Sequence, residues 1–279
     1  MNNTNEIIEL NMNGAVKKAN LKLSKMICLG ILAGMFIALG AATSNTAVHT
    51  IKDVGLARTL AGAIFPVGLM MIVFVGGELF TGNCLITMAV LDRKATVGQL
   101  LRNLIVVYFS NLVGALIIDF LVFYSGNLDY SGGLLGAYTI KVAIAKANIT
   151  PVKAVTSGIL CNMLVCLAIL MAGAAKDVAG KIWAIFFPIW AFVVGGFEHC
   201  VANRFYIPAG ILAAGNPAYV AKAEEAYGIT AAQCENLTVL KSLNNFIPVT
   251  IGNIIGGAVC IGVMYFFIFR KDWNKKAAS

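Results

Sequence analysis

The stretch VGGFEHCVANRF, residues 194–205, is the most informative about the fold, because it places polar side chains inside an apolar run. Two glycines are followed by Glu198, His199 and Asn203, and the surrounding run extends from 182 to 213. A helix that crosses a bilayer needs roughly 20 apolar residues, so this run is long enough. Lipid cannot satisfy the N–H and C=O groups of non-helical backbone, which must therefore face protein or a water-filled cavity. We expect residues 194–205 to be a helix break that lines a pathway.

The composition places the rest of the chain in a membrane as well. Of the 279 residues, 59% are hydrophobic and 12% are charged, whereas a soluble domain has about 25% charged residues. The chain is therefore predicted to be an integral membrane protein rather than a soluble enzyme. Apolar windows that predict six spans lie at 26–48, 59–77, 103–125, 154–175, 182–213 and 242–269.

The basic residues predict the orientation of these spans. Many of the 21 lysines and arginines lie in short segments beside alternate span ends, which the positive-inside rule places in the cytoplasm. These residues are Lys17, Lys18, Lys22, Lys25, Arg93, Lys94, Arg102, Lys176, Lys181, Arg270, Lys271, Lys275 and Lys276. We expect a cell-membrane protein with both termini cytoplasmic. The net charge of +8 is explained by this topology and by anionic lipid, so we expect a bilayer partner and no nucleic acid.

The two halves of the chain repeat each other. GILAGMF at 30–36 corresponds to GILCNML at 158–164. The second and fifth spans each contain FP, then VGG with a glutamate, then an asparagine. The third and sixth spans each carry two asparagines, eight residues apart, at Asn103 and Asn111 and at Asn245 and Asn253. A repeat of three spans is odd-numbered, so the second copy enters the membrane from the opposite side.

The predicted fold is therefore an all-α membrane protein of two inverted three-helix repeats. The second and fifth transmembrane helices are broken. Residues 1–24 mix apolar and basic residues and are expected to form a cytoplasmic interfacial helix. The channel domain is 25–270, with repeats at 25–125 and 154–270, and 271–279 is a cytoplasmic tail.

Four segments resemble the signature segments of the formate/nitrite transporter family. They are GGELFTGN at 76–83, GILCNMLVCLA at 158–168, GGFEHCVAN at 195–203 and PVTIGNIIGG at 248–257. The resemblance implies an aquaporin-like protomer and a homopentamer, with one pore per protomer for small monovalent anions of weak acids. Family members carry formate, nitrite, hydrosulfide or lactate, and the hydrosulfide or formate branch is the most similar. Cys200 and Arg204 depart from a common family form and bear on the substrate.

His199 is one of two histidines in the chain. Ionisable side chains at membrane depth are costly and usually mark pathways. Unperturbed imidazole titrates near pH 6.5, so it can hold or release a proton at cellular pH. The family resemblance implies that His199 is the central pore histidine and that Thr81, from the other break, is its hydroxyl partner.

Three further polar residues match family positions along the pore. By this resemblance Lys146 would draw anions inward, although a loop lysine can also be merely solvated. Asn162 and Asn253 would lie beside the pore, although ordinary hydrogen bonding between helices would also explain them.

Both breaks also carry a carboxylate and an asparagine, Glu78 with Asn83 and Glu198 with Asn203. An anion pore is a poor place for a carboxylate. We therefore expect these residues to be structural, with each glutamate accepting hydrogen bonds from freed backbone N–H groups or pairing with a nearby cation.

Six apolar residues match positions that form constrictions above and below the histidine, and as a set they fit a pore that gates by narrowness and dewetting. They are Phe65, Leu69, Leu79, Phe80, Val165 and Phe192.

The predicted function is a channel or transporter for a small anion, with hydrosulfide or formate favoured and nitrite as a further candidate. A proton-coupled anion symporter of the same fold is the main alternative. An embedded enzyme using His199 with Cys200 or Glu198 is a remote one, because adjacent helical residues point about 100° apart. The seven cysteines include no C-x-x-C and no other metal-ligand spacing, so we expect no metal and no cofactor.

Overall fold

The computed structural model describes residues 1–269, so the predicted tail at 271–279 lies outside the described residues. Residues 1–269 form helices and no strand, as predicted. The α-helices are α1 (Thr4–Ala19), α2 (Leu23–Val48), α3 (Val54–Ile64), α4 (Val67–Val75), α5 (Phe80–Asn83), α6 (Ile86–Leu91), α7 (Val97–Tyr124), α8 (Leu134–Ala147), α9 (Pro151–Ala174), α10 (Val178–Gly195), α11 (Cys200–Ala214), α12 (Pro217–Tyr227), α13 (Ala231–Glu235) and α14 (Val239–Ile254). A 3-10 turn, η1 (Asn127–Asp129), precedes α8, and a π-helix, η2 (Ile255–Val263), continues α14.

Six helical segments are long and apolar enough to cross a membrane, which confirms the predicted spans. They are Leu23–Val48, Val54–Val75, Val97–Tyr124, Pro151–Ala174, Val178–Gly195 and Val239–Phe269. The second and fifth spans are completed by short apolar helices, Phe80–Leu91 and Cys200–Ala214. Large apolar side chains such as Ile105, Phe109 and Leu121 are exposed on these segments, as expected for surfaces that face lipid or another protomer.

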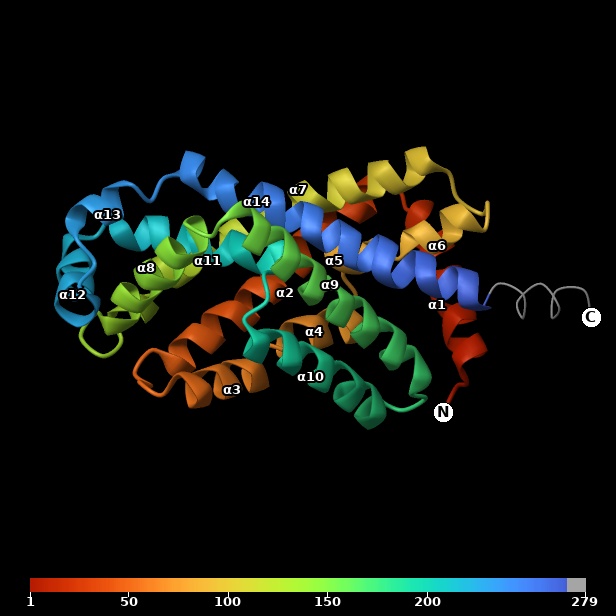
Figure 1. The fold of residues 1–279 in the computed structure, drawn as a ribbon, viewed down its shortest axis with the longest axis horizontal. Coiled ribbons are helices and arrows are strands. Elements are labelled where there is room, and N and C mark those ends of the chain that lie inside the picture. The colour runs from red at the N-terminus through yellow and green to blue at the C-terminus, as the bar shows by residue number, and fades with distance from the viewer. Residues whose placement is uncertain (270–279) are drawn as a thin grey trace, which may run out of the picture.

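The structure contains the two inverted repeats. In the first, α2 packs along α7, and in the second, α9 packs along α14. Glycines allow both contacts, since a Cβ at Gly34 would meet the backbone of Asn111 and a Cβ at Gly252 would meet that of Val155. Figure 1 shows α1 and α6 at one end of the molecule and α8, α12 and α13 at the other.

Each repeat also begins with an amphipathic helix, which lies outside the predicted repeat boundaries of 25–125 and 154–270. α1 packs against α6 and α9, and α8 packs against α11 and α2, so the two helices occupy equivalent places at opposite ends of the molecule. Residues 1–24 were expected to form a separate interfacial helix. In the structure, α1 buries Ile8, Met12, Ala15 and Ala19 against the helical core.

The end of the molecule that carries α8 contains a small hydrophobic cluster of its own. Leu135, Ile140 and Tyr219 belong to it, and the Tyr219 hydroxyl donates a hydrogen bond to Asp129 at 2.6 Å. Burial, and then the neighbouring Asp129 carboxylate, raise the pKa of Tyr219 to about 12. Tyr219 therefore remains a protonated donor throughout the physiological pH range.

Both predicted helix breaks are present. α4 ends at Val75, and Gly76 follows with φ 97°, whereas α10 is followed by Gly196 with φ 68°. A positive φ is readily adopted only by glycine, which explains the glycines at these two points. Helix resumes at Phe80 in the first break and at Cys200 in the second.

Candidate functional site between the two helix breaks

The first break is held by a network formed by Lys18, Glu78, Asn83 and Asn103. We call it the inner network, after the orientation predicted from the sequence. The Lys18 Nζ lies 3.3 Å from Glu78 Oε1 and donates to Asn83 Oδ1 at 2.7 Å. Asn83 Nδ2 in turn donates to Glu78 Oε2 at 2.7 Å and to Asn103 Oδ1 at 2.8 Å. The Glu78 carboxylate, 5% exposed, is therefore compensated by a cation and an amide.

The second break has an equivalent outer network, formed by Lys146, Glu198, Asn203 and Asn245. Lys146 Nζ donates to Glu198 Oε1 at 2.8 Å, and Asn203 Nδ2 donates to Glu198 Oε2 at 2.7 Å. Asn245 Nδ2 also donates to Glu198 Oε2, at 3.0 Å, while Asn203 Nδ2 donates to Asn245 Oδ1 at 2.7 Å. Both glutamates thus pair with a cation, which was one of the two predicted alternatives.

Asn111 satisfies the backbone that the first break leaves free. Its Oδ1 accepts from the Phe80 N–H at 3.0 Å, at the start of α5. Its Nδ2 donates to the carbonyls of Gly30 at 2.7 Å and Glu78 at 2.9 Å. One predicted alternative was that Glu78 accepts from freed backbone N–H groups. In the structure, Asn111 takes this role.

Asn253 does the same for the second break. Its Oδ1 accepts from the Cys200 N–H at 2.9 Å, and its Nδ2 donates to the carbonyls of Gly158 at 2.8 Å and Glu198 at 3.0 Å. Asn162 supports this point by donating to the Asn253 carbonyl at 2.6 Å. Interhelical hydrogen bonding, the alternative given for both asparagines, accounts for these contacts.

The two breaks meet at His199 and Thr81. The His199 Nε2 lies 3.0 Å from Thr81 Oγ1, and both side chains are buried. The Ala202 N–H donates to His199 Nδ1 at 3.0 Å, which caps the N-terminus of α11. A backbone N–H can only donate, so Nδ1 carries no proton, and a neutral imidazole then holds its proton on Nε2. This geometry orients a neutral His199 with its N–H toward Thr81.

Apolar side chains surround this pair. All six residues expected at the constrictions are at most 4% exposed and belong to one hydrophobic cluster. The Phe65 and Phe192 rings meet edge to face with centroids 5.4 Å apart, and Phe192 stacks on His199 at 5.9 Å. Phe65, Phe192 and His199 also line the floor of a large cavity, whereas Leu69, Leu79, Phe80 and Val165 lie in the packed core.

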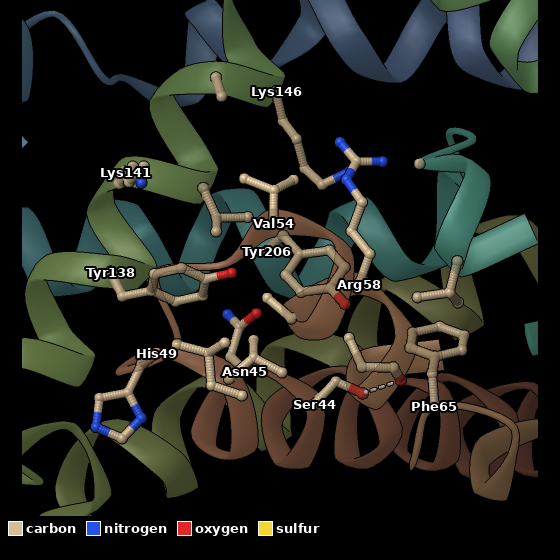
Figure 2. A pocket seen from close by; sticks show the side chains of 18 of the residues that line it. Ser44, Asn45, His49, Val54, Arg58, Phe65, Tyr138, Lys141, Lys146 and Tyr206 are labelled. Carbon is tan, nitrogen blue, oxygen red and sulfur yellow. Dashed lines mark hydrogen bonds between the residues drawn. The ribbon is translucent and has the colours of Figure 1, made fainter. Parts of the chain in front are cut away.

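That cavity opens at the end of the molecule that carries α8 and has a volume of about 940 Å³. Its basic lining residues are Lys52, Arg58, Lys141 and Lys146, together with His49, whereas Glu198 is its one acidic lining residue in the described part of the chain. Figure 2 shows Lys146 and Arg58 reaching toward each other from different helices above Tyr206. The cavity therefore presents an excess of positive charge to an approaching solute.

A smaller cavity, of about 240 Å³, lies at the opposite end. Lys18 and Lys181 line it, with Asn11 and Leu85 among the other lining residues. The sequence analysis used Lys18 only for orientation. The internal repeat could have identified Lys18. It lies on α1, which is the equivalent in the first repeat of α8, the helix that carries Lys146.

The described residues, 1–269, contain no group of three or more metal-ligating side chains that could hold a metal ion. The fold and the site together define a multi-pass membrane protein of two inverted repeats, whose broken helices meet at a buried histidine–threonine pair.

Comparisons with known proteins agree with this class. The family model for formate/nitrite transporters matches residues 5–267. A probable formate transporter of Methanothermobacter thermautotrophicus is 37% identical over 273 residues, covering 91% of this chain and 92% of that protein. The formate channel FocA of Escherichia coli K12 is 36% identical over 263 residues, covering 92% of this chain and 90% of that protein. A solved structure of a pentameric formate channel with formate bound gives a TM-score of 0.80 at 34% identity, covering 88% of this chain and 97% of that one.

The chain therefore belongs to the formate/nitrite transporter family. The resemblance found in four sequence segments is confirmed over nearly the whole chain. The relatives are named as transporters and channels, so this protein is a transport protein and not an enzyme.

Proposed function

We propose that this protein is a homopentameric channel for small monovalent anions of weak acids, with one pore in each protomer. Formate and hydrosulfide are the favoured substrates, and nitrite is a further candidate. The observation that carries the proposal is the buried His199–Thr81 pair, which joins the two breaks inside an apolar surround. The pentameric formate channel with a TM-score of 0.80 supports both the assembly and the substrate class.

The apolar surround favours passage of the neutral acid. Burying an isolated charge without a partner costs several kcal/mol or more, whereas a small neutral acid loses little on entering an apolar constriction. The basic outer cavity and Lys18 at the opposite mouth attract the anion. The anion then takes up a proton and crosses the Phe65–Phe192 region as the acid.

His199 acts as a fixed hydrogen-bond donor in this scheme. The sequence left open whether the histidine or a water supplies the proton. Protonation of Nδ1 would require breaking its bond from the Ala202 N–H, which holds the start of α11. We therefore assign the proton to water in the cavities, where the hydroxide that is left returns to the bulk solution. His199 binds the acid through its Nε2–H, which lies against Thr81 Oγ1 in the structure.

We further propose that both termini are cytoplasmic and that the loop 214–241 is outside. The basic segments support this orientation, and Figure 1 places α1 and α12 at opposite ends of the molecule. Accessibility labelling of single cysteines in intact cells tests it. Labelling of a cysteine at position 225 and protection of one at position 14 is the expected result, and the reverse pattern would contradict the orientation.

Flux into liposomes that contain the purified protein tests the function. We expect formate and hydrosulfide to enter, and sulfate to be excluded, because bringing divalent sulfate to a neutral species is too costly. Robust sulfate flux would refute passage as a neutral species. Uphill accumulation of formate driven by an inward proton gradient is expected both for passage as the neutral acid and for the symporter alternative, because in both a proton moves with each anion. Its absence would indicate passage of the bare anion.

A further inference from the structure

Arg204 is a buried cation that the proposed function does not use. Its side chain is 1% exposed, and its guanidinium lies 3.4 Å from the centroid of the Tyr108 ring. Nη1 donates to the Tyr108 carbonyl at 2.6 Å, while Nη2 is buried without a hydrogen-bond partner. Within residues 1–269, the ion pairs formed by carboxylates involve Lys18, Lys94, Lys146 and Lys222, and none involves Arg204. The charge of Arg204 is therefore not neutralised by a carboxylate.

Packing alone does not account for such a residue. Stacking on Tyr108 and one hydrogen bond hold the guanidinium in place. However, an unpaired buried charge is strongly unfavourable, and an apolar side chain of similar volume would fill the same space without that cost. By contrast, Lys18 and Lys146 each form an ion pair with a glutamate, so the cost of placing these charges in the protein is compensated.

Arg204 lies immediately behind the wall of the constriction. Its partner ring, Tyr108, meets the Phe80 ring at a centroid distance of 5.1 Å, and Phe80 directly precedes Thr81. The Tyr108 hydroxyl lies 3.2 Å from Thr250 Oγ1, which fixes the ring between α7 and α14. Arg204 also lies on α11, the helix that His199 caps. The guanidinium is thus separated from the site by only one or two layers of aromatic side chains.

We propose that Arg204 is a specificity-determining residue, which through its electric field draws the anion to the edge of the constriction, where the anion takes up its proton. It does so without touching the substrate. A charge in a low-dielectric interior acts over several ångströms, and salt screens it far less than it screens a charge at the surface. The inference rests on the proposed function and adds a second attraction, located at the constriction rather than at the mouths. The equivalent residue of the first repeat is Cys84, which follows Leu79 by five positions, as Arg204 follows His199. The field therefore comes from the second repeat only.

Two substitutions separate charge from packing, and both are measured against wild type by formate flux in liposomes. Arg204→Gln keeps a hydrogen-bond donor for the Tyr108 carbonyl but removes the charge. Arg204→Lys keeps the charge but loses the planar stack. We expect Arg204→Gln to raise the half-saturating formate concentration about tenfold, with a maximal flux within about threefold of wild type. Arg204→Lys should stay within about threefold of wild type in both quantities.

The difference between wild type and Arg204→Gln should persist when an impermeant salt raises the ionic strength, because the charge is buried. Size-exclusion chromatography and thermal unfolding identify a variant that does not assemble, and Arg204→Met then replaces Arg204→Gln as the uncharged variant. An unchanged half-saturating concentration in the uncharged variant would overturn the proposal, as would an Arg204→Lys protein that behaves like the uncharged one. If wild type itself carries no formate, the proposed function fails instead, so the two failures are distinguishable.

Discussion

The two helix breaks are alike where they are held together and different where they meet. Each has a lysine from an amphipathic helix, a buried glutamate and two asparagines, in the inner and outer networks described above. Each also has an asparagine, Asn111 or Asn253, that accepts from the first N–H of the resumed helix. At the meeting point the equivalence ends, because the residue after the glutamate is Leu79 in the first break and His199 in the second.

The comparison distinguishes the residues that stabilise the two breaks from the residues that form the site. The parts shared by both repeats keep two non-helical segments stable at membrane depth, where each unsatisfied backbone group is costly. The parts that differ supply the site. Thr81 comes from the first break, while His199 and Arg204 come from the second.

The largest effect should follow loss of a shared asparagine. Asn111→Leu and Asn253→Leu each remove three buried hydrogen bonds and leave backbone groups unpaired at about 1–3 kcal/mol each. We expect each variant to lose about 3 kcal/mol or more, or to fail to assemble, as measured by thermal unfolding in detergent. Asn148→Ala, at an exposed C-cap, is the matched control and should change little. A fully stable Asn111→Leu or Asn253→Leu protein would show that the replaced asparagine does not stabilise its helix break.

A smaller effect should distinguish the two networks. The Lys146 side chain is 18% exposed and the Lys18 side chain is 36% exposed, so the outer ion pair is better shielded from water. Glu198→Gln should therefore cost about 3 kcal/mol, and Glu78→Gln about 1 kcal/mol. The comparison is made by thermal unfolding at low and high salt, and only the inner pair should be salt-sensitive. Glu225→Gln, at an exposed pair with Lys222, is the control. Equal costs for the two substitutions would show that the exposure of the lysine partners does not matter.

Next in size should be the effect of the outer lysine on entry of the substrate. The variant Lys146→Gln combined with Glu198→Gln removes both charges and so avoids an unpaired carboxylate. We expect the half-saturating concentration for formate applied outside to rise about threefold, because the cavity loses one of the cations that face the approaching anion. Flux assays with substrate on one side measure this. An effect that appears only with substrate on the inner side would contradict the proposed orientation.

The smallest stability effect should distinguish two replacements of His199. Asparagine is a preferred N-cap and can accept from the Ala202 N–H, whereas leucine cannot. His199→Leu, which installs the residue of the first break, should be less stable than His199→Asn by about 1 kcal/mol, as measured by thermal unfolding. Equal stabilities would mean that the Nδ1 contact does not hold the start of α11.

The spans and the repeat were predictable from the sequence, because the length of an apolar run and the polar residues that interrupt it can be read locally. The meeting of His199 with Thr81 was predictable from the family resemblance. The partners of the glutamates were not, since Lys18 reaches Asn83 across 65 positions and Lys146 reaches Glu198 across 52. Neither helix that carries these lysines crosses the membrane, so hydropathy did not mark them. Asn162 and Asn253 matched pore positions, but only their contacts reveal that they bind backbone. Arg204 was noted as a departure from the family form, but Tyr108, on which it stacks, could be identified only from the packing of α7 against α11.

The pH profile of formate flux through His199→Asn, compared with wild type in liposomes, shows whether His199 or water supplies the proton. If His199 is a neutral donor and water supplies the proton, both proteins should transport faster as pH falls, because the protonated fraction of the acid rises about tenfold per pH unit above the pKa of the acid. The account predicts a lower flux for His199→Asn at every pH, with an unchanged slope. A flattened profile, with the difference confined to pH values around neutrality, would show that the imidazole itself carries the proton and would contradict the account.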